Sequence, residues 1–296
     1  MLQIVVLRGG ALGDIVLTLP ILQALRDFYP GCFVTLVAPY PQAILALHHT
    51  DRLLDLNAAG LVGLFTPGTS LPDEVRECLM ADCILSYLSD PDRTIEEKLA
   101  PLATDKFLQG PFRLNLERRP AVEQLAQPLT ALGIASIDPV PRLTPSPPTP
   151  SMNRLAIHPG SGSLDKNWPI GHWAALLGKL MPAFDEVLLI SGEADTELAE
   201  AIRPLIPAGK LRPCANRSLW DLVGELSRAT LFVGHDSGVT HVAAATGIAT
   251  VALFGPTDPT IWAPNGDQVV VIQSPNRMMA DLSVETVLGK LLDGSK

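Results

Sequence analysis

Residues 231–264 read LFVGHDSGVTHVAAATGIATVALFGPTDPTIWAP, and this stretch decides the fold class. Its β-rich apolar start predicts a strand over Leu231–Val233, and the small apolar residues from Val239 predict a packed helix. Asp236–Gly238 is then the turn between them. Because a helix start offers unpaired N–H groups and a glycine allows close approach to the backbone, this turn is a candidate phosphate site. Asp and Ser are also ordinary helix N-caps, so the turn alone leaves both interpretations open.

The second half of the chain alternates strand-like and helix-like runs. The strand-like runs are Leu155–Ile157, Val187–Ile190, Leu231–Val233 and Thr250–Phe254. The helix-like runs are Ile170–Leu180, Thr196–Leu205 and Leu219–Ser227. Successive βα units predict a parallel sheet that is covered on both faces. Strand ends that feed helices open onto one edge of such a sheet, so we expect the polar loops there to line one cleft. These loops are His158–Lys166, Ser191–Glu193 and Gly234–Gly238.

Length and composition indicate a globular protein. A chain of 296 residues, 47% of them hydrophobic, is long enough for about two domains that each bury a core. The net charge is −9 and the basic residues form no stripe, which disfavours nucleic acid and anionic lipid as partners. We therefore expect no nucleic-acid binding.

Cysteine usage and apolar windows bear on location. The four cysteines are Cys32, Cys78, Cys83 and Cys214. They form no C-x-x-C pattern and no dense framework, which is typical of reduced residues in a cytosolic protein. The apolar windows Met1–Leu7 and Val242–Phe254 are too short for a signal peptide or a membrane span. We expect a cytoplasmic protein with at most peripheral contact at the inner face of the cytoplasmic membrane.

A proline-rich stretch marks the domain boundary. Residues 138–151, DPVPRLTPSPPTPS, carry six prolines, and neither a helix nor a central strand can run through them. We expect a first domain over residues 1–143, a linker over 144–151 and a second domain over 152–280. Residues 281–296 are expected to hold a C-terminal helix, over Ser283–Leu292, with Ser283 as its N-cap.

The N-terminal half opens as another α/β unit. The pattern predicts a strand over Gln3–Leu7, a turn, and a helix over Asp14–Tyr29 that Pro20 should kink or restart. A second strand is expected over Cys32–Val37. The region Asp51–Arg119 alternates less cleanly, so its elements are not assigned individually.

The loop GGALGD, Gly9–Asp14, follows a strand and opens a helix, as dinucleotide-binding loops do. The fingerprint fails, however, because Arg8 takes the place of the first glycine and the second strand runs into Ala38-Pro39-Tyr40 without an acidic residue. What the loop offers is close backbone approach at its glycines beside the carboxylate of Asp14. Asp14 is either a helix N-cap, favourable by about 1 kcal/mol, or a functional carboxylate at the sheet edge.

Three blocks of sequence occur in a specific order along the chain. They are GDIVLTLPILQALR from Gly13, HPGSG followed by KNWP from His158, and FVGHDSGVTHVAAATG followed by LFGPTDP from Phe232. Together they resemble glycosyltransferase family 9, the ADP-heptose:lipopolysaccharide heptosyltransferases. The resemblance implies an α/β GT-B fold, in which two Rossmann-like α/β/α domains with parallel sheets face each other across a cleft. It implies an acceptor-binding N-terminal domain, a sugar-nucleotide-binding C-terminal domain, and a C-terminal helix that packs back on the first domain.

The resemblance also implies catalytic roles for two residues. Asp14 corresponds to the general base that takes a proton from the acceptor hydroxyl, with Gly10 and Gly13 in the acceptor loop of the cleft. Lys166 corresponds to a lysine on the diphosphate, where its positive charge stabilises the leaving group.

The remaining matched residues are implied to bind the donor. Asp236 corresponds to the residue that grips sugar hydroxyls, since a carboxylate accepts hydrogen bonds and would repel phosphates. The amides of Ser237 and Gly238 would hold the diphosphate, and Glu193 would bind the ribose diol. The other expected donor-binding residues are Ser161, Arg217 and His241. For His241, a phosphate or sugar ligand and a packing histidine are both left open.

These roles predict a single displacement with inversion that needs no cofactor and no metal, because Lys166 and a helix start replace the cation. The D-x-D sequence Asp90-Pro91-Asp92 is of the kind that holds manganese in another glycosyltransferase fold, but its proline favours a surface turn. The pair His48-His49 lacks metal-ligand spacing. We assign no metal ligand.

The chain departs from the family pattern at two places that we expect to touch the donor pocket. His235 stands where asparagine is often found, and Gly160, Ser161 and Ser163 stand where some members have threonines. On the acceptor side, a phosphorylated lipid or core sugar would favour basic groups on the first domain. The candidates are Arg93, Lys98, Lys106, Arg113, Arg118 and Arg119, which can equally be solvated surface charges.

We therefore expect an inverting glycosyltransferase that moves a sugar, a heptose from ADP-heptose in the family's case, to a hydroxyl of a cell-envelope glycan or lipopolysaccharide core. Two other classes stay open. A sugar-nucleotide epimerase of similar fold would turn over its substrate without an acceptor. A non-catalytic sugar-nucleotide-binding protein would tolerate the loss of Asp14.

Overall fold

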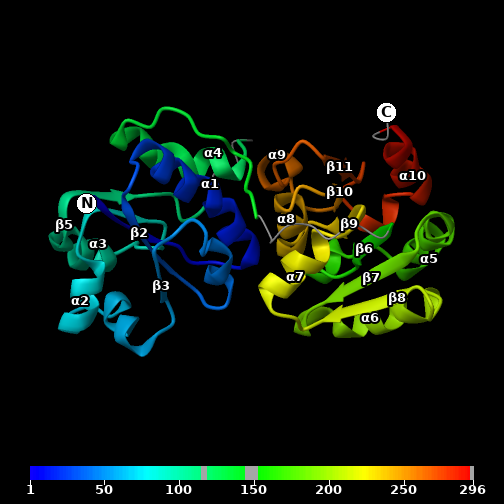
Figure 1. Ribbon diagram of the computed structural model, residues 1–296, viewed down its shortest axis with the longest axis horizontal. Coiled ribbons are helices and arrows are strands. Elements are labelled where there is room, and N and C mark those ends of the chain that lie inside the picture. Colours follow the sequence, from blue (N-terminus) through cyan, green and yellow to red (C-terminus); the bar gives the residue numbers. More distant parts are fainter. Residues whose placement is uncertain (115–118, 144–152, 294–296) are drawn as a thin grey trace. The chain divides into compact units, whose positions relative to one another are not determined.

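The computed structural model describes residues 1–114, 119–143 and 153–293 (Figure 1). The chain divides into two compact units, Met1–Pro139 and Val140–Lys296. The division lies within the proline-rich stretch, and the predicted linker 144–151 lies outside the described residues.

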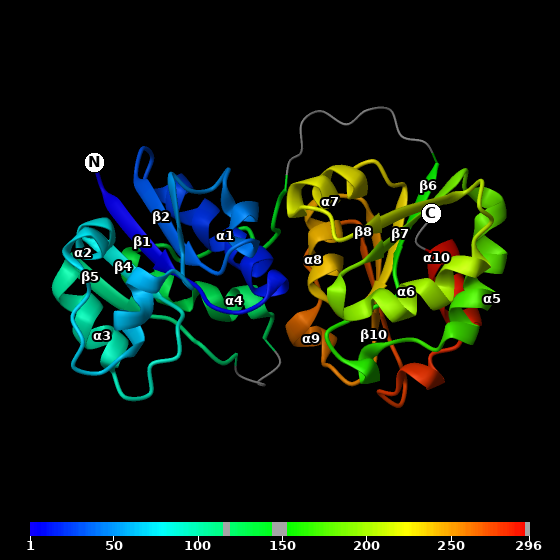
Figure 2. The ribbon, with the colours of Figure 1, turned by 90° about the horizontal axis from the view of Figure 1, so that it is seen from below.

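The first unit is built on a five-stranded parallel sheet with the strand order β3-β2-β1-β4-β5. Its strands are β1 (Gln3–Leu7), β2 (Phe33–Ala38), β3 (Arg52–Asp55), β4 (Ala81–Ser86) and β5 (Ala103–Gln109). Its helices are α1 (Leu12–Phe28), α2 (Asp73–Leu79), α3 (Thr94–Leu99) and α4 (Ala121–Ala126). Helices α1 and α4 pack together on one face, and α2 and α3 lie on the other (Figures 1 and 2). The central strands are continuous apolar runs because both faces of the sheet are covered.

The second unit is built on a six-stranded parallel sheet with the strand order β11-β10-β9-β6-β7-β8. Its strands are β6 (Arg154–His158), β7 (Glu186–Ser191), β8 (Leu211–Ala215), β9 (Leu231–His235), β10 (Ala249–Phe254) and β11 (Val269–Gln273). Counted within the unit, this is the 3-2-1-4-5-6 order of a doubly wound dinucleotide-binding fold. The switch point, where the chain reverses its direction of winding, lies between β6 and β9.

Helices cover both faces of this second sheet. They are α5 (Ile170–Leu180), α6 (Thr196–Ile202), α7 (Leu219–Leu226), α8 (Gly238–Ala245), α9 (Pro259–Trp262) and α10 (Val284–Asp293). Buried side chains of α5, α6 and α10 form one core with the sheet, while α7 and α8 pack on the opposite face (Figure 2). No helix in the described ranges is long and apolar enough to cross a membrane.

Two expectations concern individual helices. Helix α1 does not restart at Pro20: it is continuous, because Pro20 removes a single backbone donor while Ile15–Leu22 stay buried. Helix α10 begins after the N-cap Ser283, as predicted, but its buried Val284 and Val287 lie in the core of the second unit. These two side chains thus hold α10 on its own unit. Packing of this helix against the first domain stays a prediction.

Candidate functional site

The predicted donor residues of the second unit lie on loops at the carboxyl edge of its sheet. His158 at the end of β6 is paired in register with Gly234 near the end of β9, so the loops after these strands are neighbours. They flank the switch point, which is where open α/β sheets bind their ligands.

Lys166 and Asp236 form an ion pair at this edge. Lys166 Nζ lies 2.7 Å from Asp236 Oδ2, and the two side chains are 27% and 10% exposed. Lys166 comes from a short 3₁₀ helix, Leu164–Lys166, whereas Asp236 directly follows β9. The pair therefore joins the two loops and presents one cation and one carboxylate side by side, the groups suited to a diphosphate and to hydroxyls.

Ser237 is the N-cap residue of α8, and Gly238 is the first residue of this helix. Both residues are partly buried, so the start of the helix reaches the surface beside the Lys166–Asp236 pair. The first N–H groups of α8 have no partner within the helix itself, which is the property that suits a helix start to an anion. His241 lies one turn on and is only 4% exposed, which favours the packing interpretation.

A buried network at the same edge escaped the sequence analysis. His158 Nε2 lies 2.5 Å from Asp195 Oδ2, and His158 Nδ1 lies 3.3 Å from Ser237 Oγ. Asp195 ends the short 3₁₀ helix Glu193–Asp195 that follows β7, so the network joins the ends of three strands. The amide of Gly192 donates to the other carboxylate oxygen of Asp195. Burial opposes ionisation of Asp195, but the hydrogen bond and charge of His158 lower the pKa of its carboxyl below the ordinary value.

Gly160 provides the space for this network. A Cβ atom at Gly160 would overlap the carboxylate of Asp195. The glycine of the HPG sequence is therefore required because the carboxylate lies where a side chain would otherwise start.

His235 does not reach the surface at which we expected the donor to bind. Its ring is fully buried, where Nε2 accepts a hydrogen bond from the Trp168 amide at 3.0 Å and the ring packs edge-on to Trp173. Burial lowers its pKa to about 3, and the neighbouring His158 adds to this effect. The residue thus holds the segment after Lys166 against β9 from within the core.

The other predicted donor residues lie along the same edge. Ser161 Oγ contacts Ser163 O and Asn167 Oδ1, both at 2.7 Å, and so braces its own loop. Glu193 follows β7 and Arg217 follows β8, and both residues are exposed. The sheet edge therefore carries the predicted donor residues other than His241, which is buried within α8.

In the first unit, Asp14 lies in the first turn of α1 beside the end of β1. One carboxylate oxygen lies 2.6 Å from Arg8 Nη2, and the other accepts a hydrogen bond from the Ala11 amide at 2.8 Å. The Asp14 side chain is 30% exposed, whereas the Arg8 side chain is 4% exposed and its guanidinium lies over the ring of Tyr87. Burial lowers the pKa of Arg8, an effect that the charge of Asp14 opposes. Asp14 is thus both a helix cap and an ion-pair partner at the switch point between β1 and β4.

Two glycines of this loop were expected to approach a ligand. Gly10 has a φ of +103°, and a Cβ there would overlap the Asp14 carboxyl group. Gly13 lies in the first turn of α1 and is partly buried. Gly10 therefore has a conformational and a steric reason to be glycine.

The basic residues considered for an acceptor have different surroundings. Arg93 pairs with Glu96 at 2.7 Å, and the amines of Lys98 and Lys106 donate to backbone carbonyls. Arg113 and Arg119 are exposed, and Arg118 lies outside the described residues. Lys98 and Lys106 are thus engaged in holding loops.

Neither sequence considered as a metal motif forms a ligand set. Asp90 accepts from the amides of Ile95 and Glu96, and Asp92 accepts from the Thr94 amide, so both carboxylates serve the start of α3 as the turn interpretation predicts. Within residues 1–114, 119–143 and 153–293, no three His, Cys, Asp or Glu side chains are grouped to hold a metal.

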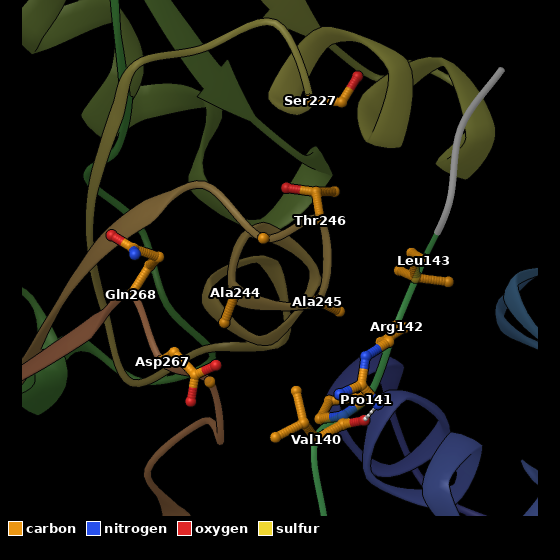
Figure 3. A pocket seen from close by; sticks show the side chains of 12 residues that line it. Val140, Pro141, Arg142, Leu143, Ser227, Ala244, Ala245, Thr246, Asp267 and Gln268 are labelled. Carbon is orange, nitrogen blue, oxygen red and sulfur yellow. Dashed lines mark hydrogen bonds between the residues drawn. The ribbon is translucent and has the colours of Figure 1, made fainter. Parts of the chain in front are cut away.

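A pocket of about 430 Å³ lies elsewhere in the second unit (Figure 3). It is lined by Val140–Leu143, the end of α8 and the turn before β11. Because α8 begins at the carboxyl edge, its end marks the opposite edge of the sheet. The pocket contains none of the predicted site residues.

Comparisons with known proteins agree with this arrangement. The profile of glycosyltransferase family 9 (heptosyltransferase) matches residues 134–292, more than half of the chain. The chain is 32% identical over 112 residues to lipooligosaccharide heptosyltransferase 2 of Haemophilus influenzae, covering 36% of this chain and 32% of that protein. It is 30% identical over 127 residues to lipopolysaccharide heptosyltransferase 1 of Escherichia coli K12, covering 43% of this chain and 40% of that protein. The chain thus spans between about a third and two fifths of the length of these curated relatives.

The solved structure of E. coli heptosyltransferase WaaC with ADP is similar over 99% of both chains, with a TM-score of 0.80 and 18% sequence identity. This likeness and the two parallel sheets show that the chain has the GT-B fold.

Proposed function

We propose, because this chain belongs to glycosyltransferase family 9, that it is an inverting glycosyltransferase. The sugar is a heptose carried by ADP, and the acceptor is a hydroxyl of a cell-envelope glycan or lipopolysaccharide core. The observation that carries the proposal is the Lys166–Asp236 pair, 2.7 Å apart, beside the start of α8 at the switch point.

On the donor side, the pair separates two tasks. Lys166 binds the diphosphate and stabilises the negative charge that grows on it as the glycosidic bond breaks. Asp236 accepts hydrogen bonds from the sugar hydroxyls, and the amides at Ser237 and Gly238 bind phosphate oxygens. Glu193, exposed after β7, accepts from the ribose diol, while Ser161 and Arg217 bind the donor from the flanking loops.

On the acceptor side, Asp14 acts as the general base. An ionised carboxylate has about four lone-pair sites, and the contacts with Arg8 and the Ala11 amide use two of them. A sugar hydroxyl can therefore bind Asp14 without displacing either partner. These fixed contacts orient the base, so kcat depends on the carboxylate of Asp14 as a positioned proton acceptor.

The partners follow from this reaction. The protein binds a sugar nucleotide and a glycan or glycolipid acceptor, requires no bound cofactor or metal, and works in the cytoplasm at the inner face of the membrane that carries the acceptor. Transfer that persists after treatment with EDTA would support the metal-independent reaction, and transfer restored only by added metal would contradict it.

The deciding test pairs a donor screen with an Asp14 variant. ADP-heptose is compared with UDP-, GDP- and dTDP-sugars for binding, and then for transfer to heptose-free lipopolysaccharide. Asp14→Asn is expected to lower kcat by about 10²–10⁴-fold while keeping most of the donor affinity.

Two results would point to the other classes. An epimerase would consume the sugar nucleotide with no acceptor present, and a non-catalytic binder would be unaffected by Asp14→Asn. The family match and the relatives favour neither class.

A further inference from the structure

Ser237, His158 and Asp195 form a hydrogen-bonded chain directly below the proposed diphosphate site. The distances are 3.3 Å from Ser237 Oγ to His158 Nδ1 and 2.5 Å from His158 Nε2 to Asp195 Oδ2. His158 and Asp195 are 4% and 9% exposed, whereas Ser237 is partly exposed at the N-cap of α8. The chain thus connects a buried carboxylate with a hydroxyl at the surface.

The direction of the inner hydrogen bond is fixed by charge. The lowered pKa of Asp195 keeps its carboxyl group ionised, so it only accepts hydrogen bonds. His158 must then carry a proton on Nε2. Nδ1, which faces Ser237, therefore carries a proton only when the imidazole holds two protons.

The outer end of the chain is also constrained. Thr240 Oγ1 lies 3.2 Å from Ser237 Oγ, and it donates its own proton to the backbone carbonyl of His235. Thr240 can therefore only accept from Ser237. Ser237 has one proton, which it gives either to His158 Nδ1 or to another acceptor, but not to both.

The two protonation states of His158 consequently set the direction of the Ser237 hydroxyl. When His158 is neutral, Nδ1 accepts the Ser237 proton, and the hydroxyl turns its lone pairs outward. When His158 carries both protons, Nδ1 donates to Ser237 Oγ, and the Ser237 proton becomes available to a phosphate oxygen. Only the second state lets Ser237 donate to an anion.

We propose that binding of a nucleoside diphosphate at this edge is coupled to the uptake of one proton from solvent by His158, through Ser237. This inference rests on the proposed function, because it assumes a diphosphate at the start of α8. The proton from solvent goes to His158 Nδ1, and the Ser237 hydroxyl turns from His158 towards a phosphate oxygen. His158 acts through Ser237 and is a positioning residue.

The surroundings of His158 are suited to this coupling. The titratable groups that face it are Asp195 from the turn after β7 and His235 from β9. His235 is uncharged near neutral pH because burial lowers its pKa to about 3, and Asp195 is anionic. An arriving diphosphate adds negative charge on the other side of Ser237, and negative charge attracts a proton to the imidazole.

The test is calorimetry of ADP binding in buffers that differ in ionisation enthalpy, at about pH 8. The terminal phosphate of ADP is already deprotonated there, because the second pKa of a phosphate monoester is about 6. The intact protein is expected to take up a measurable fraction of a proton, up to about one, for each ADP bound. His158→Gln and Ser237→Ala are each expected to abolish this uptake, and His48→Asn, which changes an exposed histidine of the first unit, is expected to leave it intact.

The outcomes separate this inference from the proposed function. ADP that binds without proton uptake, or with uptake unchanged in both network variants, would refute the coupling and leave the proposed donor site standing. Failure of the intact protein to bind ADP would overturn both. Ser237→Ala removes one partly exposed hydroxyl, so it tests the coupling even where His158→Gln does not fold.

Discussion

Replacement of Gly160 by alanine is expected to destabilise the second unit by about 2–4 kcal/mol. The new Cβ would lie closer than 3.0 Å to the Asp195 carboxyl group, so the carboxylate must leave its contact with His158. A lost hydrogen bond to a charged group costs about 1.5–3 kcal/mol, and overpacking a filled space costs about 1–3 kcal/mol. Because Asp195 can shift partly towards solvent, the two costs are not expected to add in full.

The chain offers a matched control and a selective probe for this experiment. Gly162 lies two residues further along the same loop, and a Cβ there would meet nothing within 4 Å, so Gly162→Ala is expected to change stability by less than about 0.5 kcal/mol. All four tryptophans, Trp168, Trp173, Trp220 and Trp262, belong to the second unit. Tryptophan fluorescence during urea unfolding therefore measures the stability of this unit without the first one.

The comparison has a clear refuting result. If Gly160→Ala unfolds at the same urea concentration as Gly162→Ala, Asp195 does not depend on the space at residue 160, and the buried network is not held as described. A lowered midpoint with an unchanged slope in urea is the expected result, since the folded surface area stays the same.

Three other predictions concern the Lys166–Asp236 pair, the loop glycine Gly10 and the buried His235. Lys166→Ala is expected to weaken ADP binding about 10–100-fold. Asp236→Asn should weaken binding of the sugar nucleotide more than binding of ADP, because only the sugar nucleotide presents the hydroxyls of the transferred sugar; equal losses of the two affinities in calorimetry would contradict this role. Gly10→Ala places a Cβ atom at a residue with positive φ and into the Asp14 side chain, so it should reduce sugar transfer more than Gly31→Ala, where φ is +79° and a Cβ atom meets nothing within 4 Å. Equal activities of the two variants in a transfer assay would argue against the overlap. The pKa of His235 is about 3 in the folded protein and about 6.5 in the unfolded chain, so its contribution to stability is present above pH 6.5 and is lost as the pH falls towards 3. In urea unfolding experiments from pH 7 to 4, the free energy of unfolding should therefore decline less with falling pH for His235→Asn than for the parent protein.

The fold was predictable where burial leaves a simple pattern. The central strands β1, β6 and β9 are apolar runs that end in polar loops, and α5 was predicted with its observed bounds. Strand β8 was not predicted because its sequence, LRPCA, contains Pro213, and proline is tolerated only in an edge strand such as β8. Strand β5 likewise lies at a sheet edge, and its polar residues Thr104–Lys106 leave no apolar run to predict it from.

Part of the candidate site was also predictable from the sequence. The edge rule placed Lys166 and Asp236 on loops of the same cleft, and the structure brings them into contact. The network of His158 and Asp195 was missed because a hydrogen bond between two loops has no periodicity. A weak signal was present: His158 directly follows a predicted strand, Asp195 comes five residues after the end of another, and Gly160 and Gly192 mark close approaches of the backbone to one carboxylate.

The two units solve one steric problem in the same way. In each, the first strand leads to a nitrogen-bearing side chain followed two residues later by a glycine: Arg8 and Gly10 in one unit, His158 and Gly160 in the other. In each, the space of the missing side chain is filled by a carboxylate that contacts that same nitrogen-bearing residue, Asp14 with Arg8 and Asp195 with His158. A carboxylate with little exposure at the edge of a sheet needs a partner that stabilises its charge, and it needs space to reach that partner. The spacing of Arg8 and Gly10, and of His158 and Gly160, provides both. The units differ in what the carboxylate then faces: Asp14 is 30% exposed and can meet a substrate hydroxyl, whereas Asp195 is 9% exposed and can act only through His158.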